Sequence, residues 1–170
     1  MLQQCLPDDS RVWFPVRDGN ATALSIFDRH YSARRAHVRR QAQFIGPGEK
    51  LPMLTADAGA LFVWRKFIDD ADDGTGRRQT GVNCAVFRRE QGLPASALIR
   101  AADVIADEEW PDEQRHYTYV NASKVRSVNP GYCFLMAGWQ RCGVTKGGLL
   151  ILERIRIGAW TREAVESRQA

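Results

Sequence analysis

The feature that most constrains the fold is an alternation of short β-forming runs with helical stretches. Six runs are rich in aromatic and β-branched residues, which favour strands; they cover residues 12–16, 61–68, 80–89, 116–121, 140–145 and 149–157. Helical patterns begin at Ala21, at Ser96 and near Asn129. Strands interspersed with helices in this way usually form one sheet with helices packed on it. The sequence therefore predicts an α/β fold built on a mixed sheet.

Local signals place the ends of these elements. Asn20 can cap a helix that starts at Ala21, because its side chain can accept a first-turn N–H. Asn129 is predicted to cap the third helix, with Pro130 in the first helical position, where no N–H is needed. Gly138 is predicted to close that helix in a left-handed conformation.

Two further patterns concern packing. Pro15 pushes the first strand to an edge of the sheet, because proline cannot donate to a neighbouring strand. In the long helix of residues 96–109, apolar residues at helical spacing predict the face that packs on the sheet; they are Leu98, Ala101, Ala102 and Ile105. The helix after Asn20 is expected to pack through Leu24, Phe27 and Tyr31.

Length and composition suit a single domain. The chain has 170 residues, of which 44% are hydrophobic, and its apolar runs are shorter than a membrane span needs. Its first residues lack the pattern of a secretory signal, so a cytoplasmic location is expected. None of the four cysteines forms a C-x-x-C pair. They are expected to be reduced thiols, and no metal site is predicted.

Basic residues gather near the N-terminus, while the net charge of the whole chain is +4. Five arginines fall within twelve residues, accompanied by His30 and His37; they are Arg29, Arg34, Arg35, Arg39 and Arg40. Such a run is either a solvated helix face or a surface for a polyanion such as DNA. Both interpretations stay open from the charge pattern alone.

The block Asn129-Pro130-Gly131-Tyr132-Cys133-Phe134-Leu135-Met136-Ala137-Gly138-Trp139 is the most specific motif. Together with the order of elements over residues 80–157, it resembles the GNAT acyltransferase superfamily. The resemblance implies a mixed, mostly antiparallel central sheet flanked by helices, with a splayed pair of strands at residues 80–89 and 116–121. It also implies one domain over residues 1–170, in which 1–50 form an N-terminal strand and basic helical segment, 60–157 form the acyl-CoA-binding core and 158–170 form a tail.

The resemblance implies acetyl-CoA or another acyl-CoA as cofactor. The residues expected to contact it are Val86, Phe87, Arg88, Arg89, Gly92, Ala95, Ser96, Asn129 and Tyr132. In this family a glycine-rich loop binds the pyrophosphate through backbone N–H groups at a helix start. Here Gln91 and Gly92 are out of register, and Pro94 removes one donor, so the loop departs from the family pattern.

Three residues are candidates for catalysis. Tyr132 is expected, from the family motif, to protonate the departing CoA thiolate, because a phenol holds its proton at neutral pH. Asn121 either orients a substrate at the end of its strand or is an ordinary turn residue. His30 is either a general base or a surface histidine in the basic cluster.

The segment Phe27-Asp28-Arg29-His30-Tyr31-Ser32, with residues 121–139, looks like phage-encoded GNAT relatives, among them the Mom-type proteins that modify adenine in DNA. This implies a nucleobase or modified nucleotide as acceptor, in a bacterial host cell. The substrate candidates are then Tyr31, Ser32, Arg34, Arg35 and Arg126, and Lys124 and Lys146 flank the expected crevice. The alternatives are an N-acetyltransferase for small molecules or proteins, and a non-catalytic module that binds nucleic acid; a homodimer is also left open.

Overall fold

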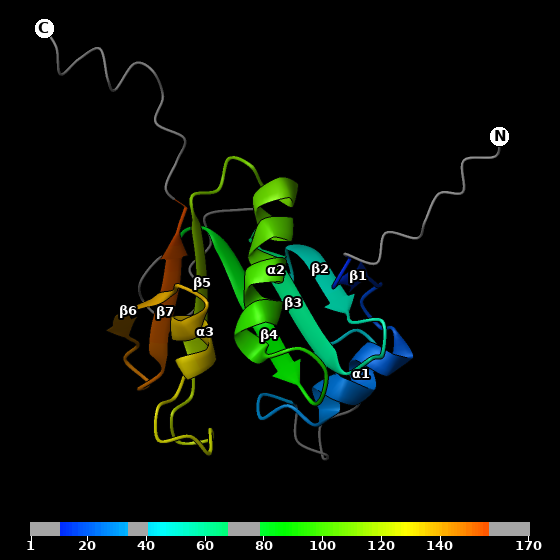
Figure 1. The fold of residues 1–170 in the computed structure, drawn as a ribbon, viewed down its shortest axis with the longest axis horizontal. Helices are drawn as coiled ribbons and strands as arrows, with labels where there is room; N and C mark the ends of the chain where they lie inside the picture. Colours follow the sequence, from blue (N-terminus) through cyan, green and yellow to red (C-terminus); the bar gives the residue numbers. More distant parts are fainter. Residues whose placement is uncertain (1–10, 34–40, 68–78, 157–170) are drawn as a thin grey trace, which may run out of the picture.

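The computed structural model describes residues 11–33, 41–67 and 79–156. Its centre is a seven-stranded sheet in the order β1-β2-β3-β4-β5-β7-β6 (Figure 1). The strands are β1 (Phe14–Pro15), β2 (Glu49–Leu54), β3 (Ala60–Lys66), β4 (Val82–Arg89), β5 (Arg115–Val120), β6 (Gln140–Val144) and β7 (Leu150–Ile155). Neighbouring strands are antiparallel except β4 and β5, which are parallel. The mixed, mostly antiparallel sheet expected of a GNAT-like fold is confirmed.

Helices lie on both faces of this sheet. α2 (Ala95–Glu109) and α3 (Tyr132–Met136) cover one face, seen in front in Figure 1. Under them lies a core that includes Trp13, Phe62 and Trp64. α1 (Ala21–Asp28) covers a second core on the other face, formed by residues that include Ile26 and Val63. Adjacent residues of β3 point to opposite cores, as the pleat of a strand requires.

All six predicted strands are present, and β1 is the edge strand that Pro15 indicated. β2 was missed. It contains Pro52, and a proline inside a short run argues against a strand. Pro52 is nevertheless accommodated, because a strand proline keeps its carbonyl, and that carbonyl accepts a hydrogen bond from Val16 N at 2.9 Å.

α1 starts where the sequence placed it, since the Asn20 side chain accepts a hydrogen bond from Ala23 N at 3.0 Å. It ends at Asp28, so Tyr31 lies beyond the helix and does not share its buried face. The buried residues of α1 are Ala23, Ile26 and Phe27. The predicted arginine cluster falls largely outside the described residues, because Arg34, Arg35, Arg39 and Arg40 belong to residues 34–40.

The prediction for the start of α3 was wrong. The helix begins at Tyr132, and its N-cap is Gly131 in a left-handed conformation with φ of 80°. Asn129 lies in the preceding turn, where its carbonyl accepts from Tyr132 N at 3.1 Å, while its side chain accepts from Arg141.

The prediction for the end of α3 is confirmed. Gly138 has φ of 94°, its N–H bonds to the Leu135 carbonyl at 3.0 Å, and Trp139 N–H bonds to the Phe134 carbonyl at 3.0 Å. This pair of hydrogen bonds is a Schellman motif, which satisfies carbonyls at the helix end.

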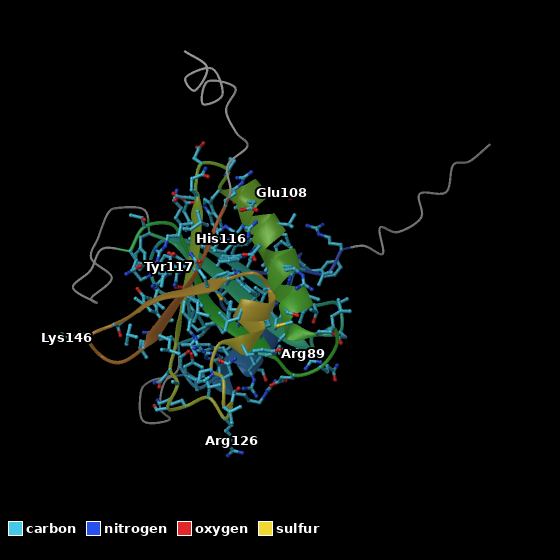
Figure 2. The ribbon with its side chains drawn as sticks, turned by 60° about the vertical axis from the view of Figure 1, so that its left-hand side comes forward. Arg89, Glu108, His116, Tyr117, Arg126 and Lys146 are labelled. Atoms are coloured by element: carbon cyan, nitrogen blue, oxygen red, sulfur yellow. The ribbon has the colours of Figure 1, made fainter. Side chains whose placement is uncertain are left out.

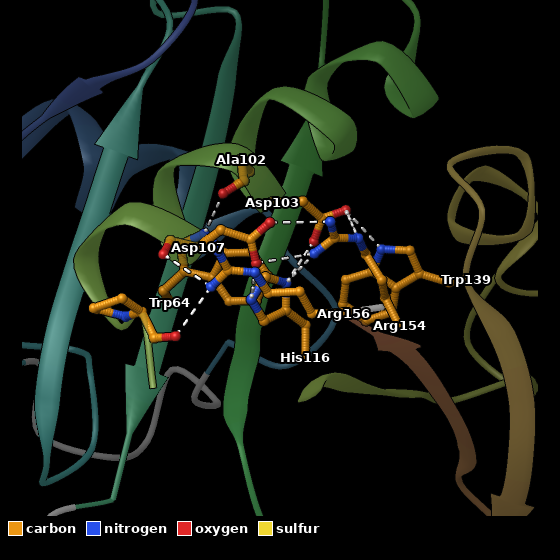
Figure 3. A network of polar contacts seen from close by, with 9 residues as sticks. Trp64, Ala102, Asp103, Asp107, His116, Trp139, Arg154 and Arg156 are labelled. Atoms are coloured by element: carbon orange, nitrogen blue, oxygen red, sulfur yellow. Dashed lines mark hydrogen bonds and ion pairs between the residues drawn. The ribbon is translucent and has the colours of Figure 1, made fainter. Parts of the chain in front are cut away.

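A buried polar network joins α2 to β5 and to the chain after α3 (Figure 3). Asp103 of α2 is only 2% exposed. It accepts hydrogen bonds from His116 Nδ1 at 2.7 Å and from Trp139 Nε1 at 2.9 Å. One turn later, Asp107 forms a two-pronged ion pair with Arg154 of β7 at 3.0 and 3.1 Å. The predicted apolar face of α2 is therefore shifted, and it includes a carboxylate.

Candidate active site

The parallel strands β4 and β5 pair only at their first residues and then separate. Their pairs are Val82 with His116, Asn83 with Tyr117 and Cys84 with Thr118. At the last pair, the Thr118 hydroxyl donates to the Cys84 carbonyl at 2.9 Å. Beyond it β4 continues to Arg89, paired with β3 on its other side only. Figure 1 shows the two strands diverging, so the predicted splay is confirmed.

β4 also carries a bulge where the separation begins. Val63 of β3 pairs with Val86, whereas the next residue, Trp64, pairs with Cys84, so Ala85 is an extra residue without a partner on β3. Bulges of this kind interrupt the ladder of hydrogen bonds and occur often beside active sites. Peptide groups around Ala85 are thereby placed outside the regular ladder, at the opening between β4 and β5.

A cavity of about 220 Å³, here called the gap cavity, lies where the strands separate. Its walls come from β4, β5, α3 and the segment that follows α1. The lining residues are His30, Tyr31, Cys84, Ala85, Phe87, Arg89, Thr118, Tyr119, Val120, Val125, Gly131, Cys133 and Phe134. Most of these side chains are apolar, so the cavity suits an uncharged group with a few polar contacts.

His30 lines the gap cavity, which is where a general base would have to lie. Its Nδ1 accepts a hydrogen bond from Ser32 N at 3.2 Å and lies 2.7 Å from Ser32 Oγ. Burial, followed by the charge of Arg88, lowers the pKa of His30 to about 4. The ring is therefore neutral at pH 7, and Nε2 carries the proton because Nδ1 accepts. Its basicity is too low for an efficient general base at neutral pH.

The two tyrosine candidates lie in different surroundings. Tyr31 lines the gap cavity and is 37% exposed, and its partial burial raises the pKa of its phenol. Tyr132 is 53% exposed and is not among the lining residues, although its neighbours Gly131 and Cys133 are. On α3, the side chains at the cavity are thus Cys133, whose thiol pKa is raised by burial, and Phe134. Whether Tyr132 takes part in catalysis stays a prediction.

Asn121 follows β5 directly, but its side chain is engaged in a turn. Its Oδ1 accepts from Ser123 N at 3.1 Å and from the Ser123 hydroxyl at 2.7 Å. This geometry is that of an ordinary Asx turn. A substrate contact of the Asn121 side chain would have to replace one of these hydrogen bonds.

The loop between β4 and α2 is held by arginines. Arg89 donates to the Gly92 carbonyl at 3.0 Å and to the Leu93 carbonyl at 2.7 Å. Gly92 takes a φ of 90°, which other residues rarely adopt. Arg88 instead bonds Glu90, at 2.8 Å.

Glu90 accepts hydrogen bonds from two arginines, because Arg29 also donates to its carboxylate, at 2.7 Å. These hydrogen bonds, that of Arg29 first, lower the pKa of Glu90 to about 2. Arg88 is therefore already engaged with a carboxylate and with the Arg29 carbonyl at 2.6 Å.

α2 begins beside this loop without a side-chain cap. Its N-cap residue is Pro94, which makes no capping hydrogen bond. The amides of the first turn, which include Ala95 and Ser96, therefore face outward without a side-chain acceptor from the cap. The start of a helix with such amides favours an anion, which is what the sequence expected of this loop.

The remaining predicted residues do not converge on the gap cavity. Val86 is buried in the core under α1. Arg126 lies in the loop after β5 and points away from the fold, and Lys146 lies at the tip of the β6–β7 turn (Figure 2). Ser32 faces a second cavity, on the α1 side of the sheet. Arg34 and Arg35 lie outside the described residues.

That second cavity, here called the α1-face cavity, has a volume of about 270 Å³. Its lining residues are Phe27, Ser32, Phe44, Ile45, Gly46, Val63, Arg65, Phe67, Asn83, Ala85, Val86, Tyr117 and Tyr119. Ala85 and Tyr119 line both cavities, so both cavities border the bulge. Sequence reasoning missed Thr118, Tyr119 and Cys133; for the first two, the available signal was their place in the strand at 116–121, one of the two strands expected to separate.

Comparison with known proteins gives matches to solved structures alone. No family model and no curated protein matches the chain. Three structures of the aminoglycoside acetyltransferase AAC(6')-Ib, with coenzyme A, with coenzyme A and kanamycin, and with ribostamycin and coenzyme A, each share 16% identity with it. They cover 71% of this chain and 71%, 72% and 69% of their own, with TM-scores of 0.47, 0.47 and 0.48. Likeness at this level carries no argument about function.

One further finding concerns membranes. Within residues 11–33, 41–67 and 79–156, no helix combines the length and the apolar character that a membrane span needs.

Proposed function

We propose that the protein transfers an acyl group from acyl-CoA to an amine. The observation that carries this proposal is the gap cavity, which opens where β4 and β5 stop pairing after Cys84 and Thr118. An unpaired strand edge beside an apolar cavity offers backbone N–H and C=O groups to an extended ligand that carries amides. The pantetheine arm of CoA is such a ligand.

The residues present fit the donor at both of its ends. The thioester carbonyl would lie near Ala85, where the bulge exposes peptide groups, and an N–H there would stabilise the developing oxyanion. The pyrophosphate would lie at Gly92 and the first turn of α2, where amides lack a side-chain cap. Pro94 supplies no N–H, so this loop offers fewer donors than the family pattern.

The reaction proposed is direct attack. The amine nitrogen bonds the thioester carbonyl carbon, the carbon–sulfur bond breaks, the nitrogen loses one proton to solvent or a base, and the CoA thiolate gains one. Tyr31 is one of the two tyrosines that line the gap cavity, with Tyr119, and burial raises the pKa of Tyr31, so it holds a proton for the thiolate. The family motif instead proposes Tyr132 as the proton donor. Substituting each tyrosine in turn distinguishes the two candidates.

For the acceptor, we propose a nucleobase or modified nucleotide, as in Mom-like DNA modification. Its support is the arginine-rich run of residues 29–40 and the sequence resemblance of the His30-Tyr31-Ser32 segment. A base in duplex DNA would have to be flipped out to reach the gap cavity. Mass spectrometry of nucleosides from cells that express the protein tests this acceptor. A nucleoside profile unchanged in the presence of acyl-CoA would rule it out in that host and leave acylation of small amines or proteins.

Calorimetric titration with acetyl-CoA tests the donor. We expect saturable binding to the wild type and its loss in Cys133→Trp, because the indole would fill the gap cavity from α3. The matched control is Met136→Trp, on the same helix at a side chain that is 53% exposed. Binding that survives Cys133→Trp unchanged would place acetyl-CoA elsewhere, and no binding to the wild type would refute the proposed donor.

A further inference from the structure

The α1-face cavity lies on the side of the sheet opposite α2 and shares two lining residues, Ala85 and Tyr119, with the gap cavity. Aromatic rings form much of its wall; they are Phe27, Phe44, Phe67, Tyr117 and Tyr119. A molecule in this cavity would therefore lie beside the bulge, next to the proposed position of the thioester.

Arg65 of β3 is the charged side chain among the described residues that line this cavity. Its Nε is buried and has no hydrogen-bond partner. Its guanidinium lies 4.3 Å from the centre of the Phe67 ring, a cation–π contact. No carboxylate of the described residues pairs with it. By contrast, two neighbouring lysines are both ion-paired: Lys50, which lies opposite Arg65 on β2, and Lys66, the next residue of β3.

The backbone leaves room for this guanidinium. Gly46 lines the same cavity, and a Cβ atom at Gly46 would overlap Arg65 Nη1. Any residue larger than glycine would displace the charged group. The contact that supports the position of the guanidinium is therefore the Phe67 ring, while Gly46 leaves space beside it.

A charged group held partly out of water is costly unless an opposite charge compensates it. A guanidinium matches the planar arrangement of oxygens in a carboxylate or a phosphate. We infer that Arg65 binds an anionic group of the acceptor, and that the acceptor is a small aromatic amine that carries a carboxylate or a phosphate, a class that includes a free nucleotide with an exocyclic amine but not a base within duplex DNA. This inference rests on the proposed function, because it takes the amine in the α1-face cavity to be the one that attacks the thioester.

The spacing along β4 fits this class of acceptor. Arg65 pairs with Asn83, and Ala85 lies two residues further along β4. Two residues of a strand span about 7 Å. An aromatic acceptor with its amine at the bulge and its acidic group at Arg65 would span at least this length, because the guanidinium lies over Phe67, on the side of Asn83 away from Ala85.

Four para-substituted anilines test the inference by calorimetry with desulfo-CoA present. They are 4-aminobenzoate, 4-aminophenyl phosphate, 4-aminobenzamide and 4-aminophenyltrimethylammonium, which share one ring and one amine. A charge-assisted hydrogen bond contributes about 1.5–3 kcal/mol, so we expect at least one anionic probe to bind about tenfold or more tightly than the amide. The cationic probe should bind most weakly. The preferred anion tells a carboxylate acceptor from a phosphate acceptor.

Variants show whether Arg65 causes the preference. Arg65→Met should remove the difference between anion and amide, Arg65→Lys should keep part of it, and Arg17→Met, which removes an exposed arginine, should keep all of it. Circular dichroism confirms that each variant is folded; if Arg65→Met is not, Arg65→Lys carries the comparison, and a preference equal to the wild type would then contradict the inference.

The outcomes separate this inference from the proposed function. If acetyl-CoA binds and its acyl group is transferred but the four probes bind equally, the acceptor class is wrong and the function stands. If the anions bind through Arg65 but acetyl-CoA does not bind, the cavity is an anion site and the acyltransferase proposal fails. A preference for the cationic probe would overturn the inference directly.

Discussion

Replacing Asp103 by alanine should destabilise the protein strongly, because its carboxylate is the shared acceptor of two buried donors. His116 Nδ1 and Trp139 Nε1 both donate to it, at 2.7 and 2.9 Å, and all three residues are at most 3% exposed. The two donors belong to β5 and to the chain after α3, while Asp103 belongs to α2. β5 is a wall of the gap cavity and Trp139 lies just after α3, another wall, so the network also positions the proposed site.

The magnitude follows from the donors left without a partner. Each buried donor that loses its acceptor costs about 1–3 kcal/mol, and breaking a buried charged pair costs about 3–5 kcal/mol in total. We therefore expect Asp103→Ala to lower the free energy of unfolding by about 4 kcal/mol. For a domain of this size that corresponds to a fall in Tm of about 10 °C. Asp103→Asn keeps one acceptor oxygen and should cost about half as much.

Urea denaturation at pH 7 measures this loss, with an unchanged m-value as the sign that only stability has moved. A double-mutant cycle with Trp139→Phe isolates one hydrogen bond, because Asp103→Ala should cost less once the indole N–H is gone. A loss below about 1 kcal/mol for Asp103→Ala would refute the reasoning, since it would mean that water or rearrangement satisfies both donors.

Three further predictions concern the site and its supports. Tyr31→Phe should lower kcat about 100-fold with little change in acetyl-CoA affinity, while Tyr132→Phe should be nearly neutral; the reverse order in a steady-state assay would return the proton donor to Tyr132. By NMR titration His30 should have a pKa of about 4. Because that value lies below the 6.5 of the unfolded chain, stability should fall as the pH drops from 6.5 to 4, and an observed midpoint near 6.5 would contradict the burial of the ring. Gly138→Ala should cost about 1 kcal/mol in urea denaturation through its φ of 94° alone, since no atom lies within 4 Å of the added methyl group; an unchanged stability would argue against a left-handed glycine there.

Periodic patterns and turn residues predicted most of the sheet because they act locally. The run of residues 80–89 and the run of 116–121 became β4 and β5, and Gly138 closed α3 as expected. β2 escaped because Pro52 weakens a strand pattern, and its pairing with β3 depends on residues seven to seventeen positions away. Asn129 failed as a cap because Gly131, two residues later, takes the conformation that starts the helix.

The candidate site was predictable only in part. The separation of β4 and β5 followed from the resemblance, and His30 and Tyr31 do line the gap cavity. Tyr132 is turned outward because Phe134 takes the buried position on the short helix α3. Arg65 carried no signal in the sequence, since its buried Nε without a hydrogen-bond partner among the described residues emerges only when β3 and the loop at Gly46 come together.

The central claim is that the space between β4 and β5 receives the acyl-carrying arm of CoA. Cysteine alkylation measures this directly, because Cys133 lines the gap cavity and Cys142 is an exposed cysteine outside it. Iodoacetamide labelling followed by mass spectrometry would give the rate at each thiol, with and without desulfo-CoA, which has no thiol of its own. We predict that desulfo-CoA slows labelling of Cys133 about tenfold or more, the protection expected at saturating ligand, and leaves Cys142 unchanged. Equal rates at Cys133 with and without a saturating amount of the ligand would contradict the claim.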